Sequence, residues 1–317
     1  MDQVRQHPMY WFIDGSLVVR ASNNLQNRQD GEVVLFKIHD GLLRRHSNFV
    51  QRAVVKQGSG GGDHDVPVMT IPPELGVRVQ DFTALLEHLY HDTPLSPEAS
   101  FQHVAAVLRV SSPTQLDLPL VHNLARSYLV AMFPSGPLPF VHPNHLEEAL
   151  TLAATFGIIS IQKGLYYSLV TTTDFEPDLG GSQPEISAAT QIGPECDFAV
   201  DAPNCHTLSP TDIERCRNLM NAVVEHFTPI LFTPPATPHM ACTDVFADKW
   251  MSLVILSAIA ENAVYKPLET LENIKRIDWA AEGLCPACVR EKRQEWTKEQ
   301  EDVWEKMDAW LELETKQ

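Results

Sequence analysis

The fold is decided by the stretch Phe12-Ile-Asp-Gly-Ser-Leu-Val-Val-Arg20, together with Val33-Val-Leu-Phe-Lys-Ile-His-Asp-Gly-Leu-Leu-Arg-Arg-His-Ser-Asn-Phe49. Two apolar runs flank a polar segment, which predicts a β-hairpin over residues 10–21 and 33–38. His39 follows the second strand, at the corner where a helix begins. Two short helices are predicted over residues 39–55, separated near Ser47, because serine favours the position that opens a helix.

The segments that follow predict one more strand and three amphipathic helices. The strand covers residues 66–71 and ends at two prolines. In the helices, apolar residues recur at intervals of three and four. They are Phe82, Leu85, Leu86 and Leu89, then Phe101, Val104, Ala105 and Leu108, and then Val121, Leu124, Ala125, Tyr128 and Leu129. Strands followed by paired helices indicate an α+β domain over residues 8–137.

Residues 138–317 are predicted to form a mostly α-helical region. Within it, residues 174–209 are acidic, rich in proline and poor in large apolar side chains, which indicates a mobile or inserted loop. Ser209 and Pro210 are typical of a helix start, and the helix is expected to end at a group of prolines, Pro229, Pro234, Pro235 and Pro238. The expected helices cover residues 145–156, 161–170, 244–264 and 286–313, and another begins at Pro210 with an apolar stripe that runs from Ile213 to Leu231. The helix at 244–264 is expected to be buried.

The composition restricts the class of protein. The 317 residues suggest about two domains, and the formal net charge of −17 argues against nucleic-acid binding through phosphates. The N-terminus lacks the apolar core of a secretory signal, and the longest apolar segment, at 250–260, is too short to span a membrane. Six scattered cysteines indicate a reducing compartment, so we expect the cytoplasm or the nucleus and no contact with a membrane.

Six short segments between residues 10 and 133 stand in a characteristic order. They are Asp14-Gly15, Phe36-Lys-Ile-His39, Leu42-Leu43, Ser47-Asn-Phe49, Asp81-Phe82 with Leu89-Tyr90, and Leu108-Arg-Val-Ser111. Their order and spacing resemble the BTB/POZ family. The rest of the chain resembles the helical tail of fungal, especially basidiomycete, members. The matching segments there are Leu152-Ala-Ala-Thr-Phe156, Gly164-Leu-Tyr166, and Cys285-Pro-Ala-Cys288 with Trp296, Trp304 and Trp310.

This resemblance implies a BTB/POZ fold, a small β-sheet flanked by helical hairpins. It also implies a protein–protein interaction module without enzymatic activity or cofactor, which self-associates or recruits a protein partner. Such domains commonly dimerise by exchanging an N-terminal segment, and only about ten residues precede the first predicted strand here. The resemblance assigns Asp14, His39 and Ser47 to the fold, and the candidate partner-binding residues are Val18, Phe82, Tyr90, Leu95 and Glu98.

Two binding surfaces of the family can be compared residue by residue. Corepressor-binding members pair an early Asp with a basic residue after the corner His. Here Asp14 matches the acid, but Asp40 stands at the basic position, so two carboxylates would repel. Members that dock on a cullin-type ubiquitin ligase scaffold carry an apolar residue two positions before a Glu. Glu98 matches, whereas Ser96 replaces the apolar anchor and weakens the expected docking of such an adaptor.

Cys285 and Cys288 form a Cys-x-x-Cys pair, which supplies two of the four ligands of a structural zinc. The other ligands would have to come from elsewhere in the chain, and the candidates are Cys205, His206, Cys216, His239 and Cys242. Pro286 predicts that Cys285 opens a helix, a position that favours thiolate. We favour free thiols for this pair, with a metal centre and a redox role as alternatives.

Two other patterns are better explained by structure than by chemistry. Asp14, His39 and Ser47 lack the nucleophile elbow of a hydrolase, so we expect His39 to bond backbone or Asp14. Val289, Trp296, Val303 and Trp310 repeat every seven residues, but polar residues interrupt the second seam of a coiled coil. We expect this stripe to pack on the chain's own helical region, with a partner groove as the alternative.

Overall fold

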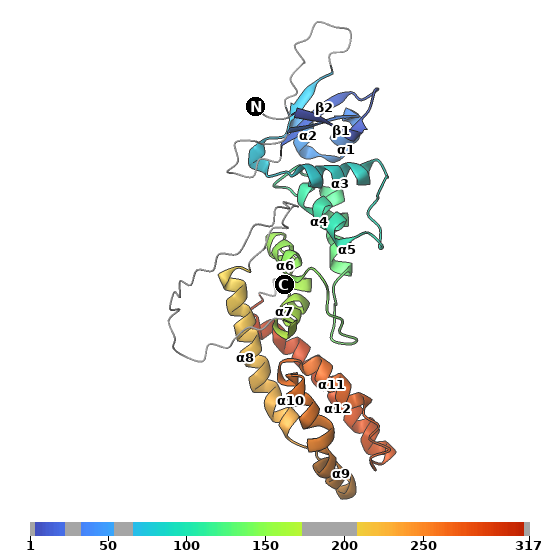
Figure 1. The fold of residues 1–317 in the computed structure, drawn as a ribbon, viewed down its shortest axis with the longest axis vertical. Helices are drawn as coiled ribbons and strands as arrows, with labels where there is room; N and C mark the ends of the chain where they lie inside the picture. The colour runs from blue at the N-terminus through green and yellow to red at the C-terminus, as the bar shows by residue number, and fades with distance from the viewer. Residues whose placement is uncertain (1–3, 23–32, 54–65, 173–207, 314–317) are drawn as a thin grey trace, which may run out of the picture. The chain divides into compact units, whose positions relative to one another are not determined.

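The computed structural model describes residues 4–22, 33–53, 66–172 and 208–313 (Figure 1). The chain divides into two compact units, residues 1–132 and 133–317. The sequence placed the division between residues 137 and 138. The acidic loop predicted at 174–209 lies almost entirely outside the described residues.

The first unit contains a four-stranded mixed sheet, which confirms the predicted α+β class. Its strands are β1 (Val4–Trp11), β2 (Leu17–Ser22), β3 (Val33–Ile38) and β4 (Val68–Thr70), and they lie in the order β1-β3-β2-β4. β2 and β3 are antiparallel, with Leu17 opposite Ile38 and Ser22 opposite Val33, as the predicted hairpin requires. β1 runs parallel to β3, and β4 runs parallel to β2.

The single strand predicted over residues 10–21 is wrong, because two strands share this stretch. β1 ends at Trp11, and the chain turns before β2, with the Gly15 amide donating to the Phe12 carbonyl at 3.1 Å. A β-carbon at Gly15 would lie 2.9 Å from the carbonyl oxygen of Lys37, so glycine is needed for this close approach. The turn contains Asp14, Gly15 and Ser16, and Asp-Gly is a common turn dipeptide that the predicted strand passed over.

Six helices complete the described part of the first unit. They are α1 (Asp40–His46), α2 (Asn48–Arg52), the 3₁₀ turn η1 (Pro73–Leu75), α3 (Val79–Leu89), α4 (Phe101–Val110) and α5 (Pro119–Ala131). α3 packs on α4, and α4 packs on α5. Phe82 of α3 meets Phe36 of the sheet edge to face, with ring centroids 5.0 Å apart. The predicted apolar faces are mostly buried, but Phe101 and Tyr128 are half-buried and Leu124 of α5 is 38% exposed.

A buried carboxylate links α3 to α4. Asp81 is 2% exposed, and its two oxygens accept hydrogen bonds from two guanidinium groups. Arg78 donates at 2.9 and 3.1 Å, and Arg109 donates at 3.1 and 3.0 Å. A buried charge requires this kind of complete pairing.

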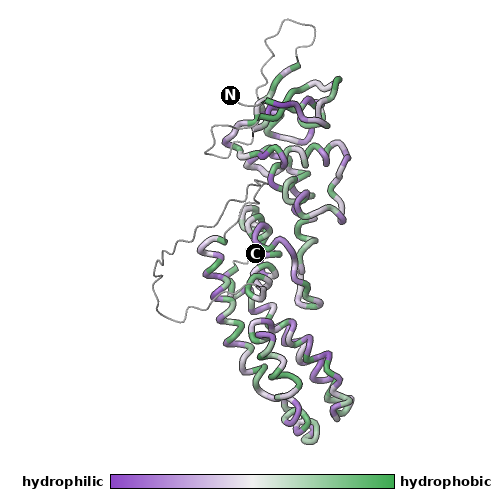
Figure 2. Tube along the Cα trace, viewed as in Figure 1, coloured by the Kyte–Doolittle hydropathy of each residue, from purple (hydrophilic) through white to green (hydrophobic). Residues whose placement is uncertain are grey.

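Helices and helical turns are the only regular elements in the described part of the second unit. Its elements are α6 (Leu146–Thr155), α7 (Ile159–Thr172), α8 (Pro210–Phe232), α9 (Met240–Trp250), the π-helical turn η2 (Met251–Ile255), α10 (Leu256–Ala260), the 3₁₀ turn η3 (Ala263–Tyr265), α11 (Pro267–Arg276) and α12 (Pro286–Trp310). Figure 2 shows mostly hydrophilic residues along α12. The sequence did not predict α11. Ser209 caps α8 as expected, since its hydroxyl accepts from the Asp212 amide at 3.1 Å.

Two predictions for this unit are wrong in part. Pro229 does not help end α8, which continues to Phe232, because the buried neighbours Phe227 and Leu231 hold its last turns in place. The helix predicted over 244–264 is present as a continuous helical run from Met240 to Ala260, but it is not buried throughout. It passes from α9 through η2 into α10, and its outer face exposes apolar side chains, including Met251, Leu256 and Ile259.

The core beside the start of α12 is built around tryptophan. Trp250, Trp279 and Trp296 pack together, with ring centroids 6.0 to 6.4 Å apart, and Phe246 contacts all three. Trp296 and Val303 are 6% and 0% exposed, so the heptad stripe of α12 packs inside its own unit, as expected. Within the described residues, no helix combines the length and apolar character needed to cross a membrane.

Candidate functional site

The corner of the first unit is a closed hydrogen-bond network around His39. The Nε2 atom of His39 lies 3.3 Å from Oδ2 of Asp14, and Nδ1 lies 3.0 Å from the Tyr90 hydroxyl. The same hydroxyl accepts a bond from the His39 amide at 3.0 Å. The hydrogen bond from His39 lowers the pKa of Asp14, and burial raises the pKa of Tyr90. The expected bond between His39 and Asp14 is present, and both ring nitrogens have partners.

Ser47 and Asp40 also have structural partners. The buried Ser47 hydroxyl donates to the Leu116 carbonyl at 2.5 Å and accepts from the Val50 amide at 3.0 Å, so it caps α2 and fixes the segment before α5. The negative charge of Asp40 is not left unpaired beside Asp14. Instead, both of its oxygens accept from the Arg44 guanidinium at 2.7 Å. These side chains stabilise the corner rather than form a reactive centre.

Two of the candidate partner-binding residues need correction. The side chains of Phe82 and Leu95 are 0% and 7% exposed, so they belong to the core. Val18 is half-buried on β2, which lies between β3 and β4 and therefore has no free strand edge. Tyr90 is half-buried and holds the His39 corner. Glu98 alone among the five is exposed.

The loop that carries Glu98 is anchored to the end of α3. The Leu95 amide donates to Nδ1 of His88 at 3.1 Å, and the Thr93 amide donates to the Glu87 carbonyl at 3.1 Å. Burial lowers the pKa of His88, which favours the neutral ring that accepts this bond. These hydrogen bonds hold the loop against α3, and Glu98 is exposed on it.

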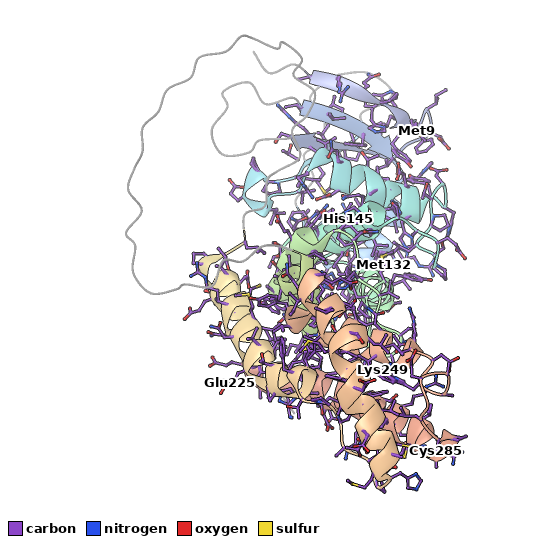
Figure 3. The ribbon with its side chains drawn as sticks, turned by 60° about the horizontal axis from the view of Figure 1, so that its bottom comes forward. Met9, Met132, His145, Glu225, Lys249 and Cys285 are labelled. Carbon is purple, nitrogen blue, oxygen red and sulfur yellow. The ribbon has the colours of Figure 1, made fainter. Side chains whose placement is uncertain are left out.

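The exposed apolar side chains of the sheet edge were not predicted. Val4, Met9 and Ile13 are 53%, 60% and 95% exposed, and all three belong to β1 or to the turn that follows it. Met9 is labelled beside the sheet in Figure 3. β1 lies at one edge of the sheet and pairs only with β3 among the described strands. Exposed apolar residues on an edge strand are typical of an association surface.

The second unit contains a polar network that the sequence did not reveal. Glu269 of α11 lies 2.5 Å from Nε2 of His142 and also accepts a bond from the Tyr167 hydroxyl. His142 Nδ1 lies 3.1 Å from the Ser168 hydroxyl. Burial opposes the charge of Glu269, but the bonds from His142 and Tyr167 outweigh it and lower its pKa. Because 127 residues separate His142 from Glu269, no local pattern could predict this contact.

The order of serine, histidine and carboxylate resembles a hydrolytic triad, but the surroundings do not suit one. Ser168 is 0% exposed on the inner face of α7. A cavity of about 570 Å³ lies beside Glu269, and neither Ser168 nor His142 lines it. A nucleophile must reach a substrate. This network therefore joins α7, α11 and the segment before α6 as a structural contact.

The most concentrated set of metal-ligating atoms in the described residues lies at the starts of α9 and α12. It consists of His239, Cys242, Cys285 and Cys288, whose ligand atoms all lie within 4.8 Å of one another. Nδ1 of His239 is 3.2 Å from Sγ of Cys285 and 3.5 Å from Sγ of Cys288. Figure 3 labels Cys285 at the beginning of α12.

The sequence predicted part of this set. Cys285 opens α12 as expected, and its sulfur accepts from the Cys288 amide at 3.5 Å. That bond, followed by the contact with His239, lowers the pKa of Cys285 to about 6. His239 and Cys242 were among the candidate partners. Cys216 is buried in α8 outside the set, and burial raises its pKa to about 12. The candidates Cys205 and His206 lie outside the described residues.

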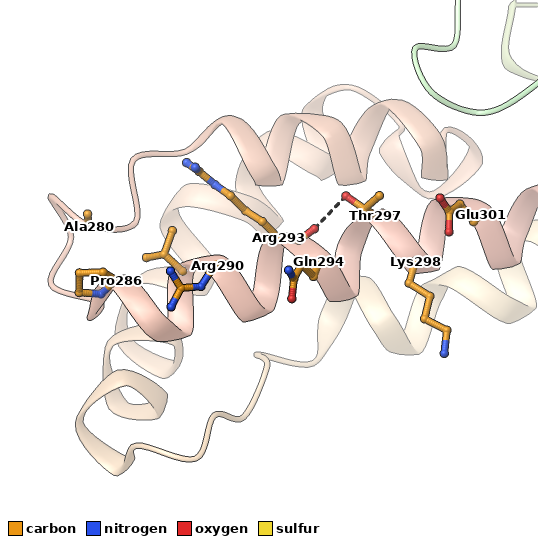
Figure 4. Close-up of a pocket in the computed structure, with 9 residues that line it drawn as sticks. Ala280, Pro286, Arg290, Arg293, Gln294, Thr297, Lys298 and Glu301 are labelled. Atoms are coloured by element: carbon orange, nitrogen blue, oxygen red, sulfur yellow. Dashed lines mark hydrogen bonds between the residues drawn. The ribbon is translucent and has the colours of Figure 1, made fainter.

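A shallow groove follows the outer face of α12 next to this set (Figure 4). Its volume is about 560 Å³, and almost all of its lining comes from one helix. The lining residues are Ala280, Pro286, Val289, Arg290, Arg293, Gln294, Thr297, Lys298 and Glu301. Arg290, Arg293 and Lys298 outnumber Glu301, so the groove has a basic character. It is a surface feature and not an enclosed binding cavity.

Comparison with known proteins found no match to a family model, a curated protein or a solved structure. The resemblance to the BTB/POZ family therefore stays a prediction from the order of short segments.

Proposed function

We propose that the first unit is a BTB/POZ-type interaction domain, without enzymatic activity, whose task is to bind another protein chain. The observation that carries this proposal is the order and pairing of its elements. A β2–β3 hairpin leads into two short helices, β4 returns beside β2, and α3, α4 and α5 pack in succession. This order agrees with the fold that the resemblance implies. The polar residues at its corner bond one another, which suits a support better than a catalyst.

The partner that we propose first is a second copy of the chain. Val4, Met9 and Ile13 place exposed apolar side chains at one edge of the sheet. A surface of this kind can pair with a copy of itself, because burying apolar groups against the same apolar groups needs no opposite charge. Pro8 lies within β1 and has no amide hydrogen. The association therefore depends on side-chain burial more than on a continuous strand ladder.

Light scattering coupled to size-exclusion chromatography tests this proposal on the full chain. The expected mass is that of two 35.5 kDa chains, and the double variant Met9→Glu/Ile13→Glu is expected to elute as a monomer. Leu120→Glu is the matched control, because Leu120 is also exposed, at 76%, but lies on α5. A wild-type chain that stays monomeric at high concentration contradicts self-association. Equal dimerisation of the double variant contradicts the surface that we name.

A second proposal is that the domain docks on a cullin-type scaffold as a substrate adaptor. It is supported by the exposed Glu98 on its anchored loop and weakened by Ser96. A pull-down with a purified scaffold, repeated with Glu98→Ala, tests it. Glu74→Ala is the control, because Glu74 is exposed in η1, outside this loop. Lack of binding by the wild-type chain contradicts the adaptor function.

A further inference from the structure

We propose that His239, Cys242, Cys285 and Cys288 bind one Zn²⁺ ion as a structural centre of the second unit. The ligands come in two pairs with the same spacing, His-x-x-Cys and Cys-x-x-Cys. In each pair the first residue caps a helix, and the second lies three positions later in the first turn. One pair belongs to α9 and the other to α12.

The distances fit a tetrahedral zinc site. With zinc–sulfur bonds of about 2.3 Å and zinc–nitrogen bonds of about 2.0 to 2.1 Å, neighbouring ligand atoms of a tetrahedron lie about 3.6 to 3.8 Å apart. The Nδ1 atom of His239 is 3.2 and 3.5 Å from two of the sulfurs. All four ligand atoms lie within 4.8 Å of one another, so small side-chain movements suffice to surround one ion.

The backbone around the cluster favours negative charge. Three thiolates and one Zn²⁺ carry a net negative charge, and the N-terminal ends of α9 and α12 both meet the cluster. Helix N-termini stabilise anions through their free amides and their dipoles. Two amides point at sulfur: the Cys288 amide is 3.5 Å from Cys285, and the Cys285 amide is 3.5 Å from Cys242. Such bonds orient the ligands of a metal centre.

The ligand set favours zinc in a closed, structural role. Three sulfurs and one imidazole fill all four positions of a tetrahedral ion, and no position is left for a substrate. A redox role needs only Cys285 and Cys288. It does not explain why His239 and Cys242 lie beside them.

The site has a clear mechanical consequence. Cys242 and Cys288 belong to the same buried cluster as Trp250, Trp279 and Trp296. The chain from α9 to α12 returns to the cluster through a turn at Gly283, whose φ of 111° favours glycine. A metal ion here links segments 43 residues apart at one end of the tryptophan core. It thereby fixes where α12 starts relative to α9.

The test uses the full chain, purified with a tag that does not bind metal. We expect one zinc per chain by elemental analysis and an apparent Kd on the order of nanomolar or tighter in competition with a chromophoric chelator. The double variant Cys285→Ser/Cys288→Ser is expected to bind at least on the order of 100-fold more weakly. Cys216→Ser is the matched control, since it removes a buried thiol of the same unit outside the cluster, and it is expected to keep full affinity.

Two measurements on the wild-type chain cover the case in which the double variant does not fold. Titration with Co²⁺ is expected to give the visible and charge-transfer bands of a tetrahedral thiolate site, and zinc is expected to abolish them. Bound zinc is also expected to protect three cysteines from alkylation until a chelator is added. The proposal is overturned by cobalt spectra without thiolate bands, by equal affinity in the double variant, or by a Cys285–Cys288 disulfide in anaerobically prepared protein.

Discussion

Two histidines occupy the same local position in the two units, and their neighbours give them different roles. His39 caps α1 and His239 caps α9, and neither ring bonds to its own helix. The ring of His39 meets a carboxylate and a phenol, which satisfy both of its nitrogens. The ring of His239 meets thiols from two helices. A histidine at a helix start therefore has no fixed function until the rest of the chain supplies its partners.

The strongest test of this contrast is to remove metal from the second unit. A chelator is expected to lower the Tm by on the order of 10 °C, because a bound ion stabilises only the folded state. Tryptophan fluorescence suits this measurement, since the second unit contains Trp250, Trp279, Trp296, Trp304 and Trp310, and the first contains only Trp11. The Cys285→Ser/Cys288→Ser variant should show no further fall. An unchanged Tm in a zinc-containing wild-type chain would remove the structural role of the ion.

In the first unit, the buried carboxylate of Asp81 links two helices as the metal ion is proposed to do in the second. Removing this carboxylate should have the next largest effect on stability. Asp81→Ala is expected to cost about 3 to 5 kcal/mol, because Arg78 and Arg109 lose their buried partner. Urea unfolding followed by circular dichroism measures this change. Asp40→Ala is the control: its pair with Arg44 is about one-third exposed, so we expect about 1 kcal/mol or less. Equal effects of the two variants would show that burial of Asp81 is unimportant.

A variant at Glu269 measures how much the polar network stabilises the second unit, independently of the proposed metal ion. Glu269→Gln is expected to cost about 2 kcal/mol at neutral pH, because it weakens bonds to a charged group. The folded state lowers the pKa of Glu269, so its stabilisation is complete above the ordinary value of 4.5 and is lost as the pH falls through the lowered pKa. Unfolding measured from pH 7 to pH 3 should show the two proteins converging in acid. A constant difference over that range would contradict the assignment.

The smallest effect is expected at the His39 corner. Tyr90→Phe removes the hydroxyl that bonds the His39 amide and ring, and we expect a loss of about 1 kcal/mol. The zinc content should not change, because the ligands belong to the other unit. Denaturant unfolding and elemental analysis of one preparation measure both quantities. A loss of zinc in this variant would mean that the two histidine centres are not independent.

Much of the local structure could be predicted from the sequence, and the failures are informative. Ser47 and Ser209 open helices as expected, since a capping hydroxyl bonds within its own first turn. The predicted partner contacts at Phe82 and Leu95 failed because an apolar residue on a helix or loop does not reveal whether it faces the core or a partner. Pro229 failed as a helix end for a related reason, because tertiary packing outweighed its local preference.

Residue patterns alone were enough to locate most of the strands and helices and to predict that Cys285 opens a helix, because periodicity and capping act over a few residues. Which elements contact one another became visible only in the folded chain. Folding brought His239 and Cys242 to Cys285 and Cys288, Glu269 to His142, and β1 alongside β3. These contacts join residues far apart in the chain. They depend on how the whole core packs, which no local pattern records.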